Sequence, residues 1–354
     1  MGRMEAMLRQ LQAEHGSDLH LAAGQPPRMR RKGSLEAIDG EPPLTDAALR
    51  GLLREITSDE QWASYDQQSD LDFAYGIPGI ARFRVNYFVQ ENGAGAVFRI
   101  IPEEIQTLEE LALPPAIREF AHLDRGLVLV TGPTGSGKST SLAALINEIN
   151  ESYAKHILTI EDPIEFVHPN KKSLFSQREV GEHARGFGPA LRAALREDAD
   201  VILVGEMRDY ETISLALTAA EMGALVFATL HTNGAAKTID RVIDAFPADE
   251  QPQARLSLSE SLAGVVSQQL LHTADGKGRC AANEILIRTS GLANVIREGN
   301  TPMLLNIIQS GKSQGMQTMD DALMTLVQSN RILSEDAYRK AIDKARFEKF
   351  APAD

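Results

Sequence analysis

The chain has 354 residues, of which 43% are hydrophobic and 24% are charged, a composition typical of a globular protein with two ordinary domains. Its formal net charge of −13 excludes a uniformly basic surface for nucleic acid, and its single cysteine excludes an internal disulfide or a multi-cysteine zinc site. No stretch of the sequence approaches the ~18 apolar residues that cross a bilayer. We therefore expect a cytoplasmic protein whose association with a membrane is peripheral.

The N-terminal part of the chain predicts a small α+β domain. Residues 4–15 carry apolar side chains at helical spacing, and residues 18–22 alternate between apolar and polar as a strand does. An acidic stretch with three prolines then follows. Beyond it, short apolar runs alternate with helical patterns, an order that is typical of a parallel sheet. We expect domains at 1–102 and 119–354, joined by a linker at 103–118.

A strand with two arginines is predicted within the first domain. Residues 81–89 alternate, with Phe83, Val85 and Tyr87 on one face, and residues 96–101 read as the partner strand of a hairpin. Arg82 and Arg84 therefore project to the same side of the sheet. From these residues alone, a solvated outer face is the favoured interpretation, and an anion-binding surface is the alternative.

The most specific motif is a phosphate-binding loop at residues 132–140. A short apolar strand precedes it and a helical pattern follows it, which is the setting that the motif G-x-x-x-x-G-K-[ST] requires. Glycines allow backbone amides to point at phosphate oxygens, and the helix N-terminus adds a partial positive charge. Lys138 is expected at the β- and γ-phosphates of ATP, and the Ser139 hydroxyl at Mg²⁺. The predicted nucleotide contacts in the loop are Thr134, Gly135, Ser136, Gly137, Lys138, Ser139 and Thr140.

Carboxylates follow two further apolar strands. One strand ends at Glu161 and Asp162, and the other ends at Gly205 and Glu206. Ligands of open α/β sheets lie at the carboxyl ends of the strands, so we expect both groups beside the phosphate loop. Because Gly205 stands where a metal-binding Asp is usual, we assign the metal to Glu206, or to Glu161 and Asp162, together with Ser139.

A third strand end and several arginines complete the predicted ATP site. A strand at residues 225–229 runs into His231, and a helix from Asp209 to Met222 precedes that strand, with Asp209 as its cap. Arginine suits the stabilisation of a γ-phosphate because it is planar and always charged. Each of the four nearby arginines is more readily an ion-pair partner, and Arg241 is the candidate for a nucleotide contact. These four are Arg192, Arg196, Arg208 and Arg241.

The order of these motifs resembles the type IV pilus retraction ATPases, the PilT family of secretion ATPases. The resemblance is carried by GPTGSGKST, ILTIEDPIEFVH, SQREVG, ALREDADVILVGEMRD and FATLHTNGAAKTIDRV, and in the first domain by SDLHLAAGQPP, ARFRVN and GAGAVFRIIP. Later segments, AFPADE and GMQTMD, are also similar to the family. The resemblance implies a RecA-like P-loop ATPase core preceded by a PAS-like domain, and a homohexamer with ATP and Mg²⁺ bound between the two domains.

The resemblance also implies roles for individual residues. Glu206 becomes the catalytic residue that polarises water, and Glu161, Asp162 and Glu165 form an acidic box. His231 belongs to a histidine box, and Arg82 and Arg84 reach the phosphates from the first domain. The implied partners are a PilC-like platform protein of the inner membrane and a PilU-like paralogue, at the inner face of the cytoplasmic membrane; nucleic acid is not expected.

Two departures from the family pattern leave alternatives open. The family usually has a Gly-His pair where this chain has Gly223 and Ala224, and residues 291–295 differ from the usual Ala-Ile-Arg-Asn-Leu. These changes bear on retraction more than on ATP binding. A PilU-like accessory subunit and an assembly or type II secretion ATPase are therefore alternatives to a retraction motor. A nucleotide-gated structural subunit without hydrolysis is an alternative of a different class.

Overall fold

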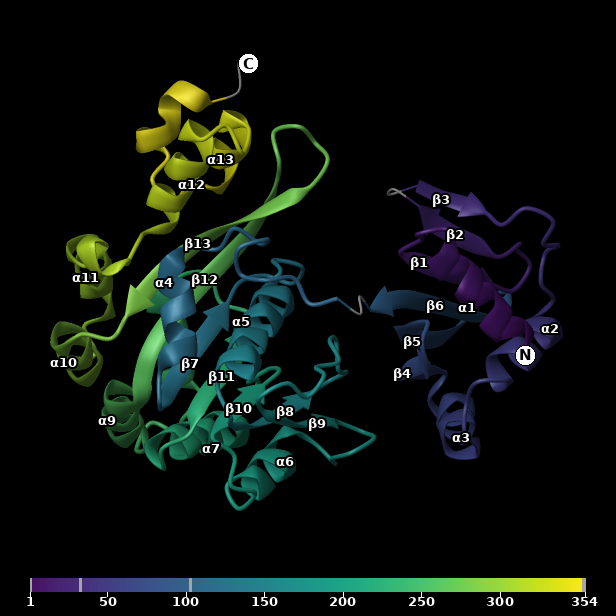
Figure 1. The fold of residues 1–354 in the computed structure, drawn as a ribbon, viewed down its shortest axis with the longest axis horizontal. Coiled ribbons are helices and arrows are strands. Elements are labelled where there is room, and N and C mark those ends of the chain that lie inside the picture. The colour runs from purple at the N-terminus through teal and green to yellow at the C-terminus, as the bar shows by residue number, and fades with distance from the viewer. Residues whose placement is uncertain (1, 32–33, 102–103, 352–354) are drawn as a thin grey trace. The chain divides into compact units, whose positions relative to one another are not determined.

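The computed structural model describes residues 2–31, 34–101 and 104–351 (Figure 1). By their contacts, the residues divide into two compact units, one of residues 1–104 with 163–167 and one of residues 105–162 with 168–354. The predicted domain boundary at residues 102 and 103 lies outside the described residues. The assignment of 103–118 as a linker therefore stays a prediction.

The first unit contains a six-stranded antiparallel sheet with the strand order β3-β2-β1-β6-β5-β4. Its strands are β1 (Asp18–Ala22), β2 (Arg28–Arg31), β3 (Ser34–Ala37), β4 (Asp70–Ile77), β5 (Ala81–Gln90) and β6 (Gly93–Ile101). Its helices are α1 (Arg3–Ala13), α2 (Asp46–Arg54) and α3 (Asp59–Gln68). The strand at residues 18–22, the N-terminal helix and the arginine-containing hairpin are confirmed.

The core of the first unit explains why β5 alternates. Phe83, Val85 and Tyr87 are fully buried, and the residues between them are half-buried or exposed. The Tyr87 ring packs edge-on against Phe98 at 6.1 Å, and its hydroxyl donates a hydrogen bond to the Leu53 carbonyl in α2. Because side chains of a strand alternate between faces, burial of one set leaves Arg82 and Arg84 together on the other face.

The second unit is built on a seven-stranded sheet with the order β13-β12-β7-β11-β10-β8-β9. All neighbouring strands are parallel except β12 and β13. The strands are β7 (Gly126–Thr131), β8 (His156–Glu161), β9 (Leu174–Glu179), β10 (Val201–Val204), β11 (Leu225–Leu230), β12 (Leu262–His272) and β13 (Arg279–Ile287). The α-helices are α4 (Pro115–Arg118), α5 (Lys138–Ser152), α6 (Phe187–Ala194), α7 (Tyr210–Glu221), α8 (Ala235–Asp244), α9 (Gln251–Ser261), α10 (Ser290–Glu298), α11 (Leu304–Ser310), α12 (Met319–Gln328) and α13 (Ser334–Lys340).

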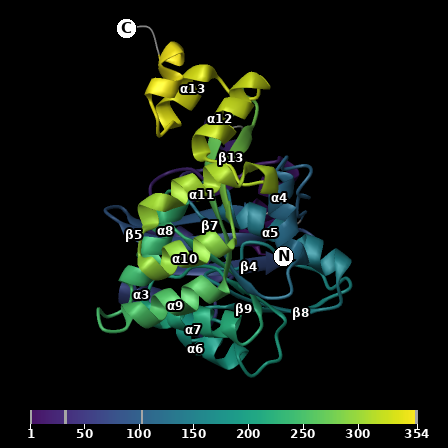
Figure 2. The same ribbon diagram turned by 90° about the vertical axis from the view of Figure 1, so that its left-hand side faces the viewer.

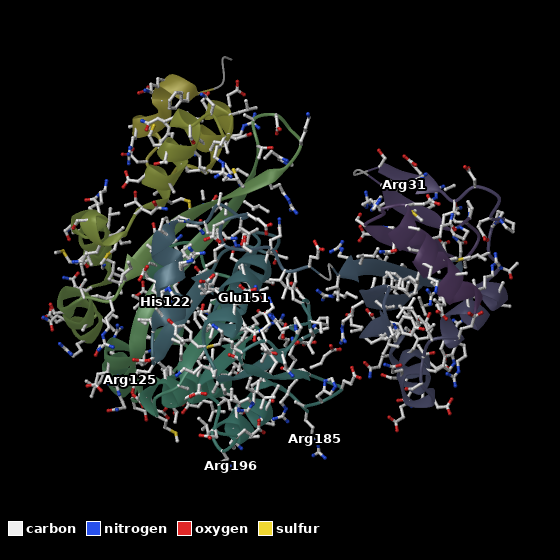
Figure 3. All side chains as sticks on the ribbon, in the orientation of Figure 1. Arg31, His122, Arg125, Glu151, Arg185 and Arg196 are labelled. Atoms are coloured by element: carbon white, nitrogen blue, oxygen red, sulfur yellow. The ribbon has the colours of Figure 1, made fainter. Side chains whose placement is uncertain are left out.

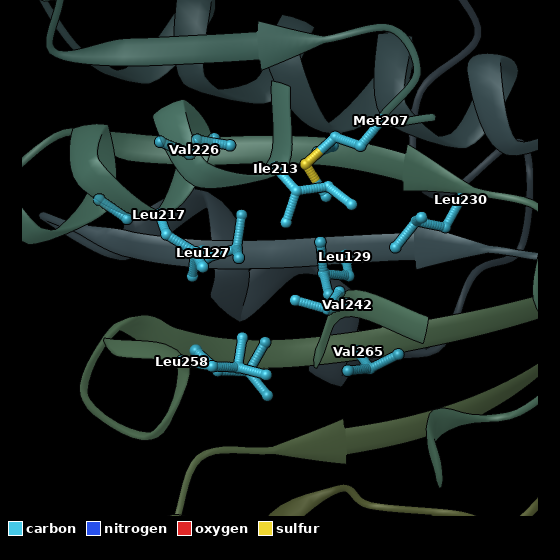
Figure 4. Close-up of a cluster of buried hydrophobic side chains, with 14 of the residues drawn as sticks. Leu127, Leu129, Met207, Ile213, Leu217, Val226, Leu230, Val242, Leu258 and Val265 are labelled. Atoms are coloured by element: carbon cyan, nitrogen blue, oxygen red, sulfur yellow. The ribbon is translucent and has the colours of Figure 1, made fainter. Parts of the chain in front are cut away.

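Helices cover both faces of this sheet. Leu127 and Leu129 of β7 pack in one core with residues of α6 to α11, and Figure 4 shows Leu217, Val242 and Leu258 gathered around them. The alternate residues of β7 pack in a second core with α4 and α5. Strands buried on both faces read as continuous apolar runs, which is why β7, β8, β10 and β11 could be located in the sequence.

The C-terminal helices form two groups. α8, α9, α10 and α11 contact one another on one face of the sheet (Figure 2). α12 and α13 pack in a separate cluster against the far ends of β12 and β13, and this cluster includes the fully buried Leu323 of α12 and Phe347, which follows α13. Among the described residues, no helix has the length and apolar character needed to cross a membrane.

Candidate nucleotide site

The phosphate loop lies between β7 and α5, as predicted. All of β7 is buried, and α5 begins at Lys138 directly after the loop. Gly132 has a φ of +143°, and a Cβ atom there would lie 2.2 Å from the carbonyl oxygen of Gln268. Gly137, with a φ of +83°, is the residue before α5. These positions require glycine because the backbone is left-handed and, at Gly132, a neighbouring strand leaves no room for a side chain.

The polar groups of the loop fit an anionic ligand. The Lys138 ammonium donates hydrogen bonds to the carbonyls of Gly132 at 2.8 Å and Pro133 at 3.2 Å, which keeps it on the loop. The Ser136 hydroxyl is buried, and among the described residues it has no hydrogen-bond partner. A buried polar atom normally has a partner. Together with the amides of the loop and the start of α5, it fits a phosphate group.

The predicted carboxylates lie at the ends of neighbouring strands. β11, β10 and β8 follow β7 in order across the sheet, and all four strands are parallel. Glu161 ends β8, where its Oε1 accepts hydrogen bonds from Thr159 Oγ1 at 2.6 Å and from Gln177 Nε2 at 3.3 Å. Asp162 follows it and is exposed. The parallel strands therefore bring Glu161 and Glu206 to the same end of the sheet as the phosphate loop, the end where the strands have their carboxyl termini.

Two side chains contact the Glu206 carboxylate. Its Oε2 accepts a hydrogen bond from Arg208 Nη2 at 2.7 Å, and its Oε1 lies 3.2 Å from Nε2 of His231, which follows β11. The hydrogen bond from Arg208 lowers the pKa of Glu206 below its ordinary value, against a burial effect that raises it. The carboxylate is therefore ionised at neutral pH, and its side chain is only 19% exposed.

The four arginines near these motifs have different surroundings. Arg208 pairs with Glu206, and Arg192 pairs with Glu211 at 2.6 Å, so both are ion-pair partners as predicted. Arg196 is exposed after the end of α6 (Figure 3). Arg241 donates a hydrogen bond to the Arg208 carbonyl at 3.4 Å. This contact connects Arg241 to Arg208, the residue that pairs with Glu206. The predicted contact between Arg241 and nucleotide stays a prediction.

Arg82 and Arg84 belong to the first unit. Arg82 is half-buried and Arg84 is exposed, both on the face of β5 that is opposite to the core. Glu165 lies within residues 163–167, which group by contacts with the first unit. The role of Arg82 and Arg84 at the phosphates stays a prediction, and so does the place of Glu165 in the acidic box.

The oxygen atoms at the sheet edge fit a hard divalent cation. Within residues 2–31, 34–101 and 104–351, no group of three or more His, Cys, Asp and Glu is arranged to hold a metal ion by itself. Mg²⁺ is usually held by one or two protein oxygens together with substrate phosphates, so a dedicated protein cage is not needed. Ser139, in the first turn of α5, and the carboxylates of Glu161, Asp162 and Glu206 are oxygen donors of the required type.

Sequence reasoning missed the residues that support the loop from β12. The Gln268 amide, which is 1% exposed, donates to the Ser136 carbonyl at 2.7 Å and accepts from the Ser141 hydroxyl at 2.9 Å. The signal was present as Ser267 and Gln268, two polar residues that directly follow the apolar run of residues 262–266. Polar side chains at fully buried strand positions are uncommon unless they have hydrogen-bond partners.

A glycine-rich loop between a buried parallel strand and a helix, with carboxylates at the ends of adjacent strands, defines a P-loop nucleotide-binding protein. Residues 6–347 match the family described as Type II/IV secretion system protein, and the chain belongs to this family.

Known proteins of this family resemble the chain over nearly its whole length. It is 54% identical to the type IV pilus retraction ATPase PilT of Pseudomonas aeruginosa over 92% of this chain and 94% of that protein. It is 41% identical to the type IV pilus ATPase PilU of the same organism, over 95% and 88% respectively. A crystal structure of the pilus retraction motor PilT with bound ADP superimposes with a TM-score of 0.91, at 42% identity, over 99% of both chains. The predicted fold class is confirmed.

Proposed function

We propose that this protein is a hexameric ATPase that hydrolyses ATP to drive retraction of type IV pili. The observation that carries the proposal is the 54% identity to the retraction ATPase PilT, which covers 92% of this chain and therefore extends over both of its units. The site supplies the chemistry, because a phosphate loop, an ionised glutamate and a histidine lie at one edge of the second unit's sheet.

Each side chain has a distinct role in the proposed reaction. Lys138 and the amides of residues 134–140 bind the phosphates, and Ser139 lies where it orients the β–γ end of ATP. Glu206 accepts a hydrogen bond from the attacking water and so directs its lone pair at the γ-phosphorus. His231 holds the Glu206 carboxylate in place. Arg82 and Arg84 donate to the γ-phosphate oxygens, where negative charge develops in the transition state.

Mg²⁺ is proposed to be held by Ser139 with one or two of the carboxylates Glu161, Asp162 and Glu206. When bound, it neutralises charge on the β- and γ-phosphate oxygens. Glu161 already accepts two hydrogen bonds through Oε1, which fixes its orientation at the end of β8. Orientation of a metal-binding carboxylate by such neighbours is a general feature of metal sites.

The proposed partners follow from the same assignment. The motor works as a homohexamer on a PilC-like platform protein, at the inner face of the cytoplasmic membrane, and a PilU-like paralogue works beside it. The net charge of −13 argues against nucleic acid as a partner.

Turnover of ATP by purified hexamers tests the proposal. We expect the wild-type protein to hydrolyse ATP. Glu206→Gln should bind ATP with similar affinity but lose turnover. Lys138→Ala should lose both ATP binding and turnover, while circular dichroism shows an intact fold. Binding without turnover in wild-type hexamers would instead indicate a nucleotide-gated structural subunit. Retained turnover in Lys138→Ala would contradict the assignment of the phosphate loop.

The pilus phenotype tests the direction of work. Deletion of the gene should give hyperpiliated cells that do not twitch, because pili are assembled but not removed. Loss of pili would indicate an assembly ATPase. Ala224, in place of the family's usual histidine, favours a PilU-like accessory subunit as the second candidate. Complementation of cells that lack PilT separates the two, because an accessory subunit fails to restore twitching there.

A further inference from the structure

Four buried polar residues form two adjacent pairs across β12 and β13. Ser267 lies opposite Glu284, and Gln268 lies opposite Asn283. They are 2%, 6%, 1% and 1% exposed in that order, within strands that are otherwise mostly apolar. Burial of such groups is costly unless hydrogen bonds compensate. We call these four residues the polar ladder, and their hydrogen bonds lead to three different parts of the second unit.

One face of the polar ladder holds the phosphate loop. Gln268 donates to the Ser136 carbonyl, and its oxygen accepts from the hydroxyl of Ser141 and from Nδ2 of Asn283, each at 2.9 Å. One amide group therefore fixes the loop, the first turns of α5 and β13 relative to one another.

The opposite face holds the start of α8, shortly after His231. Ser267 Oγ accepts from the Gly234 amide at 2.8 Å, and Glu284 Oε1 accepts from the Ala235 amide at 2.8 Å. Ala235 is the first residue of α8. The first amides of a helix have no partner within the helix, and a negative charge there is favourable. The buried Glu284 carboxylate therefore fixes the end of the segment that begins with His231.

The second oxygen of Glu284 reaches another helix. Oε2 accepts from the amide of Met319, the first residue of α12, at 3.4 Å. Gln317 reinforces this connection, because its side chain donates to the Asn283 carbonyl at 2.8 Å and its backbone pairs with Ile285. These residues belong to the GMQTMD segment at 315–320, to which the proposed ATPase chemistry assigns no role.

We propose that Glu284 is a positioning residue that couples the segment after His231 to the C-terminal helices α12 and α13. The carboxylate is buried and accepts a hydrogen bond from the first amide of each of α8 and α12. A displacement of the α8 start therefore moves α12 or breaks one of the two hydrogen bonds. The bond to Met319 is the longer and weaker one, so it is the bond that responds first. The inference rests on the proposed nucleotide site, because the proposed cause of the displacement of the α8 start is a response of His231 to the bound nucleotide.

Hydrogen exchange of the full-length protein tests this coupling. Exchange in residues 319–328 is compared with saturating ADP and with a non-hydrolysable ATP analogue. In wild type, exchange at the start of α12 should differ between the two nucleotides. Glu284→Gln retains only one acceptor oxygen, so this difference should disappear. Its kcat should fall by roughly tenfold, equivalent to about 1.4 kcal/mol of transition-state stabilisation, while KM for ATP changes less than about twofold.

Asp320→Asn provides a matched control. Asp320 is also buried and also accepts two backbone hydrogen bonds, from Ile342 at 2.8 Å and Asp343 at 2.9 Å, but both donors lie after α13. Asp320→Asn should speed exchange in α12 with either nucleotide and keep both the difference between nucleotides and the kcat. Equal behaviour of Glu284→Gln and Asp320→Asn would overturn the coupling, and so would the absence of any nucleotide-dependent difference in wild type.

A second pair of variants tests the other partner of the hydrogen bond, the Met319 amide that donates to Glu284. Met319→Pro deletes the amide hydrogen, and proline is well tolerated at the first position of a helix. Met319→Ala keeps the amide and loses the same buried side chain. The nucleotide-dependent difference should persist in Met319→Ala and vanish in Met319→Pro, and its persistence in both would contradict the proposal. The exchange experiment needs only nucleotide binding, so it remains decisive even if wild type proves not to hydrolyse ATP.

Discussion

The Glu206 side chain combines partial burial with contacts to Arg208 and His231. Arg208 and His231 each occupy one carboxylate oxygen, so a water molecule that Glu206 is to polarise must share or displace one of them. Arg208 is the more exposed partner, with 74% of its side chain accessible against 43% for His231, so this is the contact that we expect to yield. The ion pair then serves to keep Glu206 ionised and in place between turnovers.

Removal of Arg208 should change the pH dependence of turnover. The hydrogen bond from Arg208 is the main cause that lowers the pKa of Glu206, and burial alone raises it. In Arg208→Ala, the pKa of Glu206 therefore rises, and the acidic limb of kcat/KM moves to higher pH. A kcat/KM profile from pH 4 to 8 measures the shift. An unchanged acidic limb in Arg208→Ala would mean that another group controls it.

His168 should limit the stability of the second unit in acid. Burial lowers the pKa of His168 from 6.5 to about 4, with a smaller effect of Lys171, and its ring stacks on Phe175 at 4.6 Å. The neutral ring therefore contributes stability that is complete above pH 6.5 and is lost as the pH falls toward 4. One pKa unit corresponds to 1.36 kcal/mol, so about 2 kcal/mol should be lost by pH 5.

Two substitutions at His168 isolate this effect. His168→Phe keeps a stacked ring that cannot titrate, so its calorimetric unfolding temperature should fall less than that of wild type between pH 7.5 and pH 5. His168→Gln, which cannot titrate either, should show the same weak pH dependence at a lower overall stability. If both variants follow the wild-type pH dependence, a different group accounts for the acid sensitivity.

At the scale of elements, the sequence predicted helices and strands correctly where the spacing of apolar residues alone decides the structure. The helix after Asp209 was predicted with Asp209 as its cap, and α7 begins at Tyr210 with the Asp209 side chain accepting from the Thr212 amide at 2.8 Å. In the second unit, β7, β8, β10 and β11 could be located because both their faces are buried, whereas β9, β12 and β13 were not among the predicted strands. In β5, alternation alone located the core face, because Phe83 and Val85 are fully buried.

Contacts between elements distant in the chain could not be predicted. Gln268 holds Ser136 across more than a hundred residues, and that proximity depends on β12 pairing with β7. In the sequence, nothing distinguishes Glu284 from other polar residues. Its hydrogen bonds with the amides of Ala235 and Met319 exist only because the fold brings these residues together. Periodicity reports which face of an element is buried, but it carries no information about which backbone amides that face will meet.

At the scale of the whole molecule, the division of the predicted site between two units has a consequence for catalysis. Lys138, Glu206 and His231 belong to the second unit, while Arg82 and Arg84 belong to the first. The second unit alone holds the phosphate loop, so we expect it to supply most of the binding energy of ATP. Guanidinium groups supplied by a separate unit contribute mainly when negative charge develops on the γ-phosphate.

The double variant Arg82→Ala, Arg84→Ala should therefore lose hydrolysis and keep ATP binding. We expect kcat to fall on the order of 10²-fold, as when donors to a developing charge are removed, with little change in the Kd for ATP. Steady-state turnover and equilibrium binding measure the two quantities. Arg99→Ala is the matched control, because Arg99 lies beside Arg84 in the sheet register and already pairs with Asp18 at 2.8 Å. Loss of binding in proportion to turnover, or loss of neither, would show that the two arginines are not transition-state donors.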